Sequence, residues 1–299
     1  MNYKNFNNYQ LSFINYQLLI IIFLSLLLNS CGDNPPVDYQ SQNFVEAYLI
    51  VDKPITGVNL MLTQSVTDSF NYANSFIRNA DVFIKYNGIT LKLVIDPTGD
   101  KGYYYPDTSL LVLPETIYNL EIRLKSGIVI TATDTTPARF KWIAEPPDTL
   151  DYPLDSIHFS NGTDTIVRWS ASNHNYPYIL RTKCLDTMQY GKYINGDTTE
   201  KNRRCYRPHP NMASPNYTEL TAWGIIPNYE TGILWTGFKW YGLYDITVQS
   251  PDLAYLQWMV QYMRQSQYNP LLGNIKNGIG TFSSASQISK TVFIKKNIP

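Results

Sequence analysis

From residue 43 onward, apolar and polar residues alternate over short stretches. Residues 81–96, "DVFIKYNGITLKLVID", show the pattern most clearly, since apolar side chains recur at every second position on both sides of Asn87-Gly88. Asn and Gly tolerate the positive φ angles that a two-residue type I′ turn requires. The stretch therefore predicts a β-hairpin.

The same alternation recurs at residues 117–136, with Tyr118, Leu120 and Ile122 on one face and a turn at Ser126-Gly127. Short alternating strands joined by regular turns are typical of a β-sandwich. The fold class predicted is mainly β, with an N-terminal β-sandwich over residues 43–140.

A proline-rich stretch after Pro137 marks a domain entrance, and we expect a C-terminal β-sandwich over residues 141–299. Its predicted features are an insertion at about 185–221 and one helix at about 251–265, capped by Ser250. A closing strand is expected near residues 290–297, where "KTVFIKKN" is rich in β-formers.

The first thirty residues differ from the rest. Leu18–Leu28 is an apolar run of about eleven residues, too short for a membrane-spanning helix and typical of a secretory signal. Cys31 follows directly after Leu28-Asn29-Ser30, which resembles a bacterial lipobox. We expect a signal peptide over 1–30, lipidation of Cys31, with palmitate as the expected added acyl chain, and a tether over 31–42. The alternative is an ordinary signal peptide with a chance cysteine.

The charge balance bears on partners and sites. Lys+Arg and Asp+Glu both number 24, and a zero net charge argues against nucleic acid. The three histidines are scattered singly, and no catalytic or phosphate-binding motif is present, so we expect no metal, no cofactor and no enzyme activity. Cys184 and Cys205 are expected to form a disulfide, the alternative being two separate buried thiols.

Two features keep other functions open. The pairs Glu145/Asp148 and Asp148/Asp151 could act as the carboxylates of a hydrolase. The chain also holds 24 Tyr and 6 Trp, dense at 102–106 and 235–244. These rings either pack a sandwich core or, if exposed, stack on sugars in a glycan-binding module.

The segment "NPLLGNIKNGIGTFSS" resembles the C-terminal signature of a Bacteroidetes-type outer-membrane lipoprotein family of unknown function. Its matching residues are Asn274, Ile275, Gly278, Gly280 and Phe282. Upstream, Val45–Leu49 and Thr136-Pro137 are similar to that family's first sandwich.

The resemblance implies a first sandwich like those of prealbumin or carboxypeptidase regulatory domains and a second like fibronectin type III. It also implies an outer-membrane lipoprotein, monomeric apart from its receptor, that serves as an accessory of a TonB-dependent receptor. It carries no catalytic residues.

The residues of the signature also have a physical interpretation. Gly278 and Gly280 suit a tight loop, Asn274 can bond nearby backbone, and Ile275 and Phe282 can bury as anchors. We therefore expect Asn274–Phe282 to be a shaped structural loop that borders a partner site. A broad apolar patch beside it would favour a receptor accessory over a glycan binder or a hydrolase.

Overall fold

The protein is mainly β, as the alternation predicted. The computed structural model describes residues 39–55, 57–65, 69, 72–97, 102–153, 165–173, 177–185, 221–238, 242–264 and 273–295. Residues 42–299 form one compact unit. The insertion predicted at about 185–221 lies almost wholly outside the described residues, as do Cys31 and Cys205.

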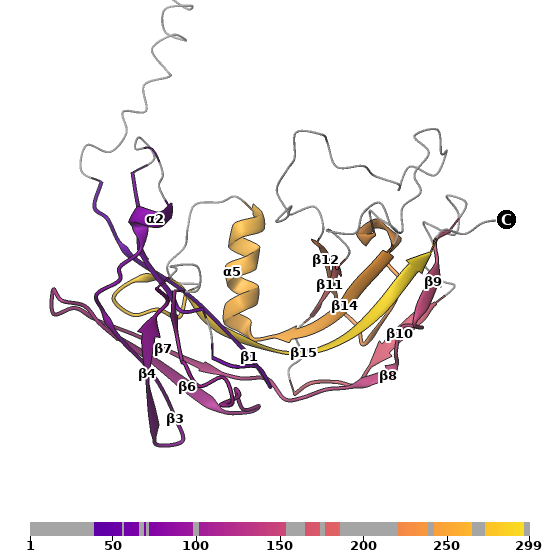
Figure 1. The fold of residues 1–299 in the computed structure, drawn as a ribbon, viewed down its shortest axis with the longest axis horizontal. Coiled ribbons are helices and arrows are strands. Elements are labelled where there is room, and N and C mark those ends of the chain that lie inside the picture. Colours follow the sequence, from indigo (N-terminus) through magenta and orange to yellow (C-terminus); the bar gives the residue numbers. More distant parts are fainter. Residues whose placement is uncertain are drawn as a thin grey trace, which may run out of the picture. The chain divides into compact units, whose positions relative to one another are not determined.

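The strands form three sheets (Figure 1). The largest contains β1 (Asn43–Ile50), β2 (Asn59–Leu62), β9 (Thr149–Asp151), β11 (Tyr178–Cys184), β12 (Thr221–Ile226), β14 (Gly242–Pro251) and β15 (Ile279–Lys295). The second contains β3 (Asp81–Tyr86), β4 (Ile89–Ile95), β5 (Tyr103–Tyr104), β6 (Ile117–Arg123) and β7 (Val129–Thr135). The third contains β8 (Trp142–Ala144), β10 (Ile166–Trp169) and β13 (Glu230–Gly232). The helical elements are α2 (Tyr72–Ser75), η3 (Trp235–Gly237) and α5 (Leu253–Arg264).

The two predicted hairpins are confirmed. β3 and β4 are antiparallel and joined by Asn87 (φ 45°) and Gly88 (φ 77°). β6 and β7 are also antiparallel, and the turn between them holds Gly127 at φ 85°. Residues at every second position of these strands are buried, which is the pattern that the sequence predicted.

One large sheet contributes to both hydrophobic cores. Its strand order is β12-β11-β14-β15-β1-β2, with β9 also paired to β15. β1 and β2 pack with the five-stranded sheet to form the first core, which includes Val45, Leu60, Ile84 and Leu120. The second core includes Trp169, Tyr178 and Tyr244, from β10, β11 and β14.

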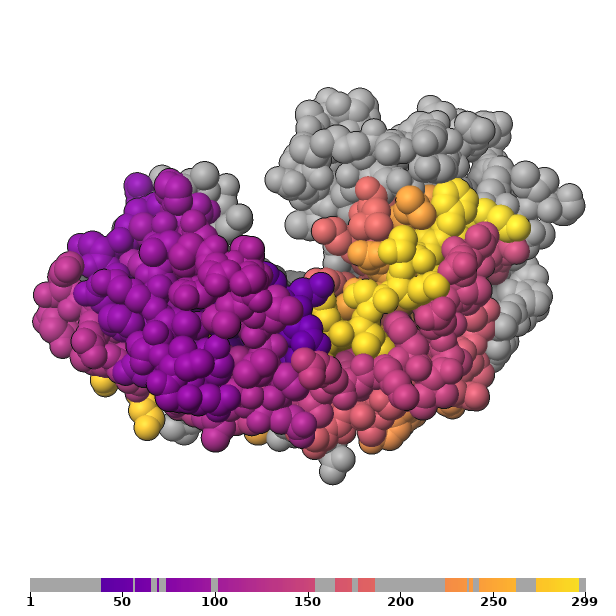
Figure 2. All heavy atoms as spheres, turned by 60° about the horizontal axis from the view of Figure 1, so that its bottom comes forward, coloured from indigo at the N-terminus to yellow at the C-terminus, as the bar shows by residue number. Residues whose placement is uncertain are grey.

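β15 belongs to both cores. Its first part pairs in parallel with β1, and Phe282 is fully buried in the first core. Its later part pairs with β14 and β9, and Val292 and Ile294 are buried in the second core. In Figure 2 its yellow atoms lie beside the pink atoms of the segment that ends in β9. A boundary at residue 140 therefore does not separate the two cores, because Phe282 of β15 returns to the first.

Two local expectations need correction. The helix is present, but Ser250 and Pro251 are the last residues of β14, and Asp252 caps the helix instead. The loop expected up to Phe282 ends earlier, because β15 already begins at Ile279. Residues 280–286 are buried on both faces, so this part of the strand has no apolar–polar alternation to reveal it.

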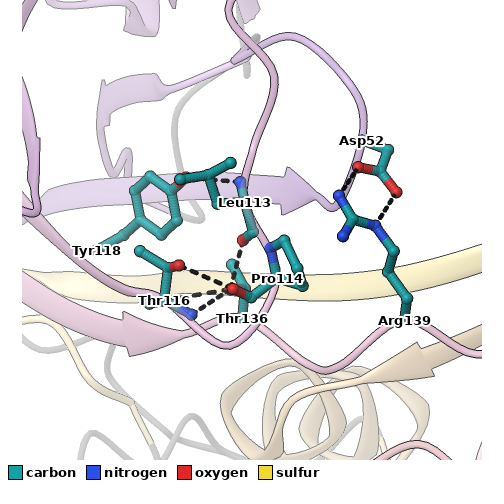
Figure 3. Close-up of polar contacts among 7 residues, drawn as sticks. All are labelled: Asp52, Leu113, Pro114, Thr116, Tyr118, Thr136 and Arg139. Atoms are coloured by element: carbon teal, nitrogen blue, oxygen red, sulfur yellow. Dashed lines mark hydrogen bonds and ion pairs between the residues drawn. The ribbon is translucent and has the colours of Figure 1, made fainter.

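Buried hydrogen bonds fix the chain where it leaves β7 (Figure 3). The Thr136 hydroxyl donates to the carbonyl of Leu113 at 2.7 Å and accepts from the amide of Thr116 at 3.0 Å. The Tyr118 hydroxyl accepts from the amide of Leu113 at 2.8 Å. Just beyond, the Arg139 guanidinium makes a two-pronged ion pair with Asp52, and its hydrogen bonds lower the pKa of that carboxyl.

Replacing Thr136 with valine is expected to lower the free energy of unfolding by about 1–3 kcal/mol. The side chain is fully buried, and the substitution leaves the amide of Thr116, which is also buried, without its partner. Thr133→Val is the matched control, since its hydroxyl makes an exposed bond to Asn119. Equal denaturation midpoints for the two variants would contradict this role for Thr136.

Candidate functional site

The segment that carries the family resemblance lies along the free edge of β7. The Asn274 amide group donates to the carbonyl of Thr133, and Asn277 donates to that of Val129 at 2.8 Å. Between them, the backbones of Lys276 and Thr131 bond to each other at 2.8 and 3.3 Å. The segment therefore occupies polar groups of an edge that would otherwise be open to another strand.

The same segment is also tied to the start of β15. The Asn274 side chain accepts from the amide of Phe282 at 3.0 Å and donates to the carbonyl of the same residue. Ile275 is partly buried against the first core. Asn274 thus bridges β7 and β15, which are far apart in the sequence.

Gly280 and Gly278 each occupy a position that requires glycine, but the physical cause differs between them. Gly280 has a φ of 113°, and a Cβ there would overlap the backbone carbonyl of Val45. Gly278 does not have a positive φ, whereas the residue before it, Asn277, does (φ 62°). A Cβ on Gly278 would lie 2.9 Å from the carbonyl oxygen of Asn43. Both positions let β15 approach β1 closely.

Beside this segment lies an open groove of about 570 Å³, here called the basic groove. It is lined by Asn43, Leu62, Phe76, Ile77, Arg78, Asn79, Leu124, Lys125 and Ser126. The groove adjoins the segment at two points, because Asn43 touches Gly278 and the amide of Leu124 bonds to Ile128, next to Val129. Leu62, Ile128 and Val129 are each about 40% exposed, at 42%, 43% and 40%. Exposed apolar side chains thus lie in the groove, at Leu62, and in the neighbouring turn and strand, at Ile128 and Val129.

The lining of the basic groove carries cations and no carboxylate. The Arg78 guanidinium lies 5.6 Å from the ring centre of Phe76, and Lys125 stands in the exposed turn between β6 and β7. Among the described residues, neither cation has an acidic partner within ion-pairing distance. This arrangement suits an anionic group attached to an apolar body.

A second polar cluster lies in the interior below α5. Asp134 of β7 and Asp252 are 8% and 5% exposed, and their carboxyl groups are hydrogen-bonded neighbours. Burial, followed by the charge and hydrogen bond of Asp134, raises the pKa of Asp252 to about 8. Oδ2 of Asp134 finds no donor on any described residue. Asp252, which retains its proton up to that pKa, can donate it to Asp134.

Asp252 also holds the helix in place. Its carboxylate oxygens accept from the amides of Tyr255 at 2.9 Å and Ala254 at 3.3 Å, and its own amide donates to Ser284 of β15. The Tyr48 ring of β1 packs on Tyr255, with ring centres 4.7 Å apart. Burial raises the pKa of Tyr48 well above its usual value. The carboxyl pair therefore lies where α5, β1, β7 and β15 meet.

The pairing of Asp134 with Asp252 could not be predicted from the sequence, because the two residues are more than a hundred positions apart. One signal was present. Asp134 occupies an inward position of β7, in step with Ile130 and Ala132, where an apolar residue is usual.

The carboxylate pairs considered for a hydrolase have lysine partners. Lys290 lies 3.1 Å from Glu145 and 2.7 Å from Asp148, and Lys295 lies 3.0 Å from Asp151. The hydrogen bond from Lys290 lowers the pKa of Asp148. A general acid needs the opposite shift.

The dense aromatic stretches lie largely in the cores. Tyr103, Trp235, Phe238 and Tyr244 are all less than a tenth exposed. Trp240 and Tyr241 lie outside the described residues. Cys184 is buried in the second core, and its disulfide with Cys205 stays a prediction.

The described ranges bring no three His, Cys, Asp or Glu side chains together where they could hold a metal ion. None of the helices in the same ranges has the length and hydrophobicity that crossing a bilayer requires.

Comparison with known proteins identifies no relative by sequence. No family model matches the chain, and no curated protein does. One solved structure, from work on the host cell surface retention of a 1.5-MDa bacterial ice-binding adhesin, is similar at 10% identity and a TM-score of 0.20. The match covers 86% of this chain and 65% of that chain. Nothing about function follows from a similarity of this size.

Gly280→Ala is expected to destabilise the protein by more than Gly127→Ala does. Both glycines have positive φ, so both variants suffer backbone strain on the order of 1–3 kcal/mol. Only at Gly280 would the new methyl group also meet backbone, whereas nothing lies within 4 Å of a Cβ at Gly127. Thermal unfolding of the two variants measures the difference, and equal shifts would show that β15 does not need to approach β1 this closely.

The carboxyl pair predicts a fall in stability as the pH rises from about 4 to about 8. In this range the unfolded chain has released the Asp252 proton, whose usual pKa is 3.8, while the folded protein retains it up to about 8. The folded state then binds more protons, so the free energy of unfolding decreases with pH, by an amount on the order of a few kcal/mol in total.

Asp252→Asn should remove this decrease, since an amide donates to Asp134 without titrating. Asp107→Asn is the control, because Asp107 is exposed and its bonds to Ser109 lower its pKa, so it titrates below this range. Chemical denaturation at pH 5 and at pH 8 gives the measurement. If the wild-type protein is as stable at pH 8 as at pH 5, and its stability depends on pH in the same way as that of Asp252→Asn, then Asp252 does not retain its proton in the folded state.

Proposed function

We propose that this protein is a non-enzymatic, lipid-anchored component of the outer membrane that binds a partner protein, with a TonB-dependent receptor as the candidate partner. The observation that carries the proposal is the basic groove, an open surface with exposed apolar side chains beside Asn274–Asn277. A patch of this kind beside the C-terminal segment is the feature that favours a receptor accessory over the other functions considered.

The anchor rests on Cys31, which directly follows the apolar run Leu18–Leu28. Acyl chains hold a soluble domain at a bilayer by burying methylene groups, at about 0.8 kcal/mol each. A tether over residues 31–42 would then lead directly to Asn43, which both begins β1 and lines the basic groove. The groove would thus begin where the tether joins the folded unit.

The exposed apolar residues provide the driving force for binding. Leu62 is exposed in the groove, and Ile128 and Val129 are exposed close to Leu124 of its lining. Covering such surface contributes about 25 cal/mol per Å², and contiguous apolar patches on a soluble protein commonly mark interaction sites.

The two alternatives have less support. Glycan stacking needs exposed rings, and the aromatic residues of the dense stretches that the structure describes are mostly in the cores. A hydrolase needs a carboxyl group with a raised pKa as its general acid, whereas the hydrogen bond from Lys290 lowers the pKa of Asp148. Asp252, whose pKa is raised, is more than nine-tenths buried.

One purification of the native lipoprotein tests both the lipid anchor and the partner protein. Purification from detergent-solubilised envelopes should yield a diacylglycerol-modified Cys31 by mass spectrometry and a co-purifying outer-membrane protein. Cys31→Ala should release the protein from the membrane fraction. Unchanged membrane retention of that variant, or purification of the wild type without any partner, would overturn the proposal.

A further inference from the structure

We propose that the basic groove receives an acidic, extended segment of the partner protein, with its carboxylates at Arg78 and Lys125 and its apolar side chains against Leu62 and Leu124. This inference rests on the proposed function and specifies the chemistry of the partner. The charges around the groove, its concave form and the strand edge beside it support the inference.

The first support is the contrast between the groove and the sheet beside it. Across the outer face of β3, β4 and β6, cations are neutralised within the chain: Lys85 and Arg123 both pair with Glu121, and Lys92 pairs with Asp81. Arg78 and Lys125 form no ion pair with any described residue, although Asp81 is close enough for the charge of Lys125 to lower the pKa of its carboxyl. The groove is therefore locally positive and complements carboxylates.

The second support is the placement of the two cations. The Arg78 guanidinium is held over the Phe76 ring, and Arg78 and Lys125 are both exposed. A guanidinium presents a planar set of donors that fits a carboxylate, and an ammonium adds a second positive charge. Leu62, Phe76, Ile77 and Leu124 provide the apolar part of the same lining.

The third support is the form of the groove. The groove is an open concavity of about 570 Å³, which has room for a short stretch of chain. Phe76 makes a β-bridge with Met61, and the amide of Ile77 bonds to Leu60 at 2.9 Å, so the large sheet continues past β2 into the groove wall. Extended segments commonly dock beside such strand edges.

The test uses a zero-length carbodiimide reagent on intact envelopes, which joins a lysine amine to a carboxylate in direct contact. We expect a cross-link from Lys125 to an Asp or Glu in the partner, identified by peptide mass spectrometry. A synthetic peptide of that segment should then bind the purified lipoprotein. The same peptide with Asn and Gln in place of Asp and Glu should bind at least about tenfold more weakly.

Three variants make the test specific. Lys125→Arg should keep the partner but lose the cross-link, because it keeps the charge and removes the amine. The double variant Arg78→Glu with Lys125→Glu should reduce co-purification of the partner by about tenfold or more. The double variant Lys141→Glu with Lys183→Glu, which reverses two exposed charges elsewhere, should not.

The outcomes separate this inference from the proposed function. If the partner co-purifies equally well with the groove double variant, the groove inference is wrong and the proposed function stands. If no partner co-purifies with the wild type, the proposed function itself fails. If the groove variant loses sedimentation with phosphatidylglycerol vesicles while the partner is retained, the groove contacts lipid, and the inference is overturned.

Discussion

The parallel pairing of β15 with β1 is the interaction on which the rest of the structure depends. It brings Phe282 into the first core, while residues 285–295 pair with β14 and β9 and contribute Val292 and Ile294 to the second. Without it, the first core loses Phe282, and the large sheet is split between β15 and β1. The chain needs a close approach of two backbones to achieve this, and Gly280 permits it by having no Cβ to meet the carbonyl of Val45.

Several local contacts depend on the pairing of β15 with β1. Asn274 joins the start of β15 to the edge of β7, and so holds β7 in place against the strand that both cores share. Asp252 connects the helix α5 to Ser284 of the same strand, and the proton that it shares with Asp134 reaches back to β7. The basic groove begins at Asn43, next to Gly278, and its form therefore depends on the same contact between β1 and the C-terminal segment.

The sequence predicted the features that depend on local pattern. Alternation and the Asn87-Gly88 turn located the hairpins, because one face of each strand is buried and the other is not. The first part of β15 was missed because it is buried on both faces and contains glycine and serine, which strands usually avoid. The basic groove was not foreseen either, since its lining comes from four separate stretches of the chain, and only long-range strand pairing brings Leu62, Arg78 and Lys125 together.

The central claim is that β15 makes the two cores one cooperative unit, and native-state hydrogen exchange after Phe282→Ala tests it most directly. Phe282 is fully buried in the first core, and its truncation should cost about 3–5 kcal/mol. If the cores unfold together, the slowest amides of β11 and β14 in the second core should lose protection to the same extent as those of β3 and β6. Unchanged protection in β11 and β14, with loss confined to β3 and β6, would show that the cores unfold separately and would contradict the claim.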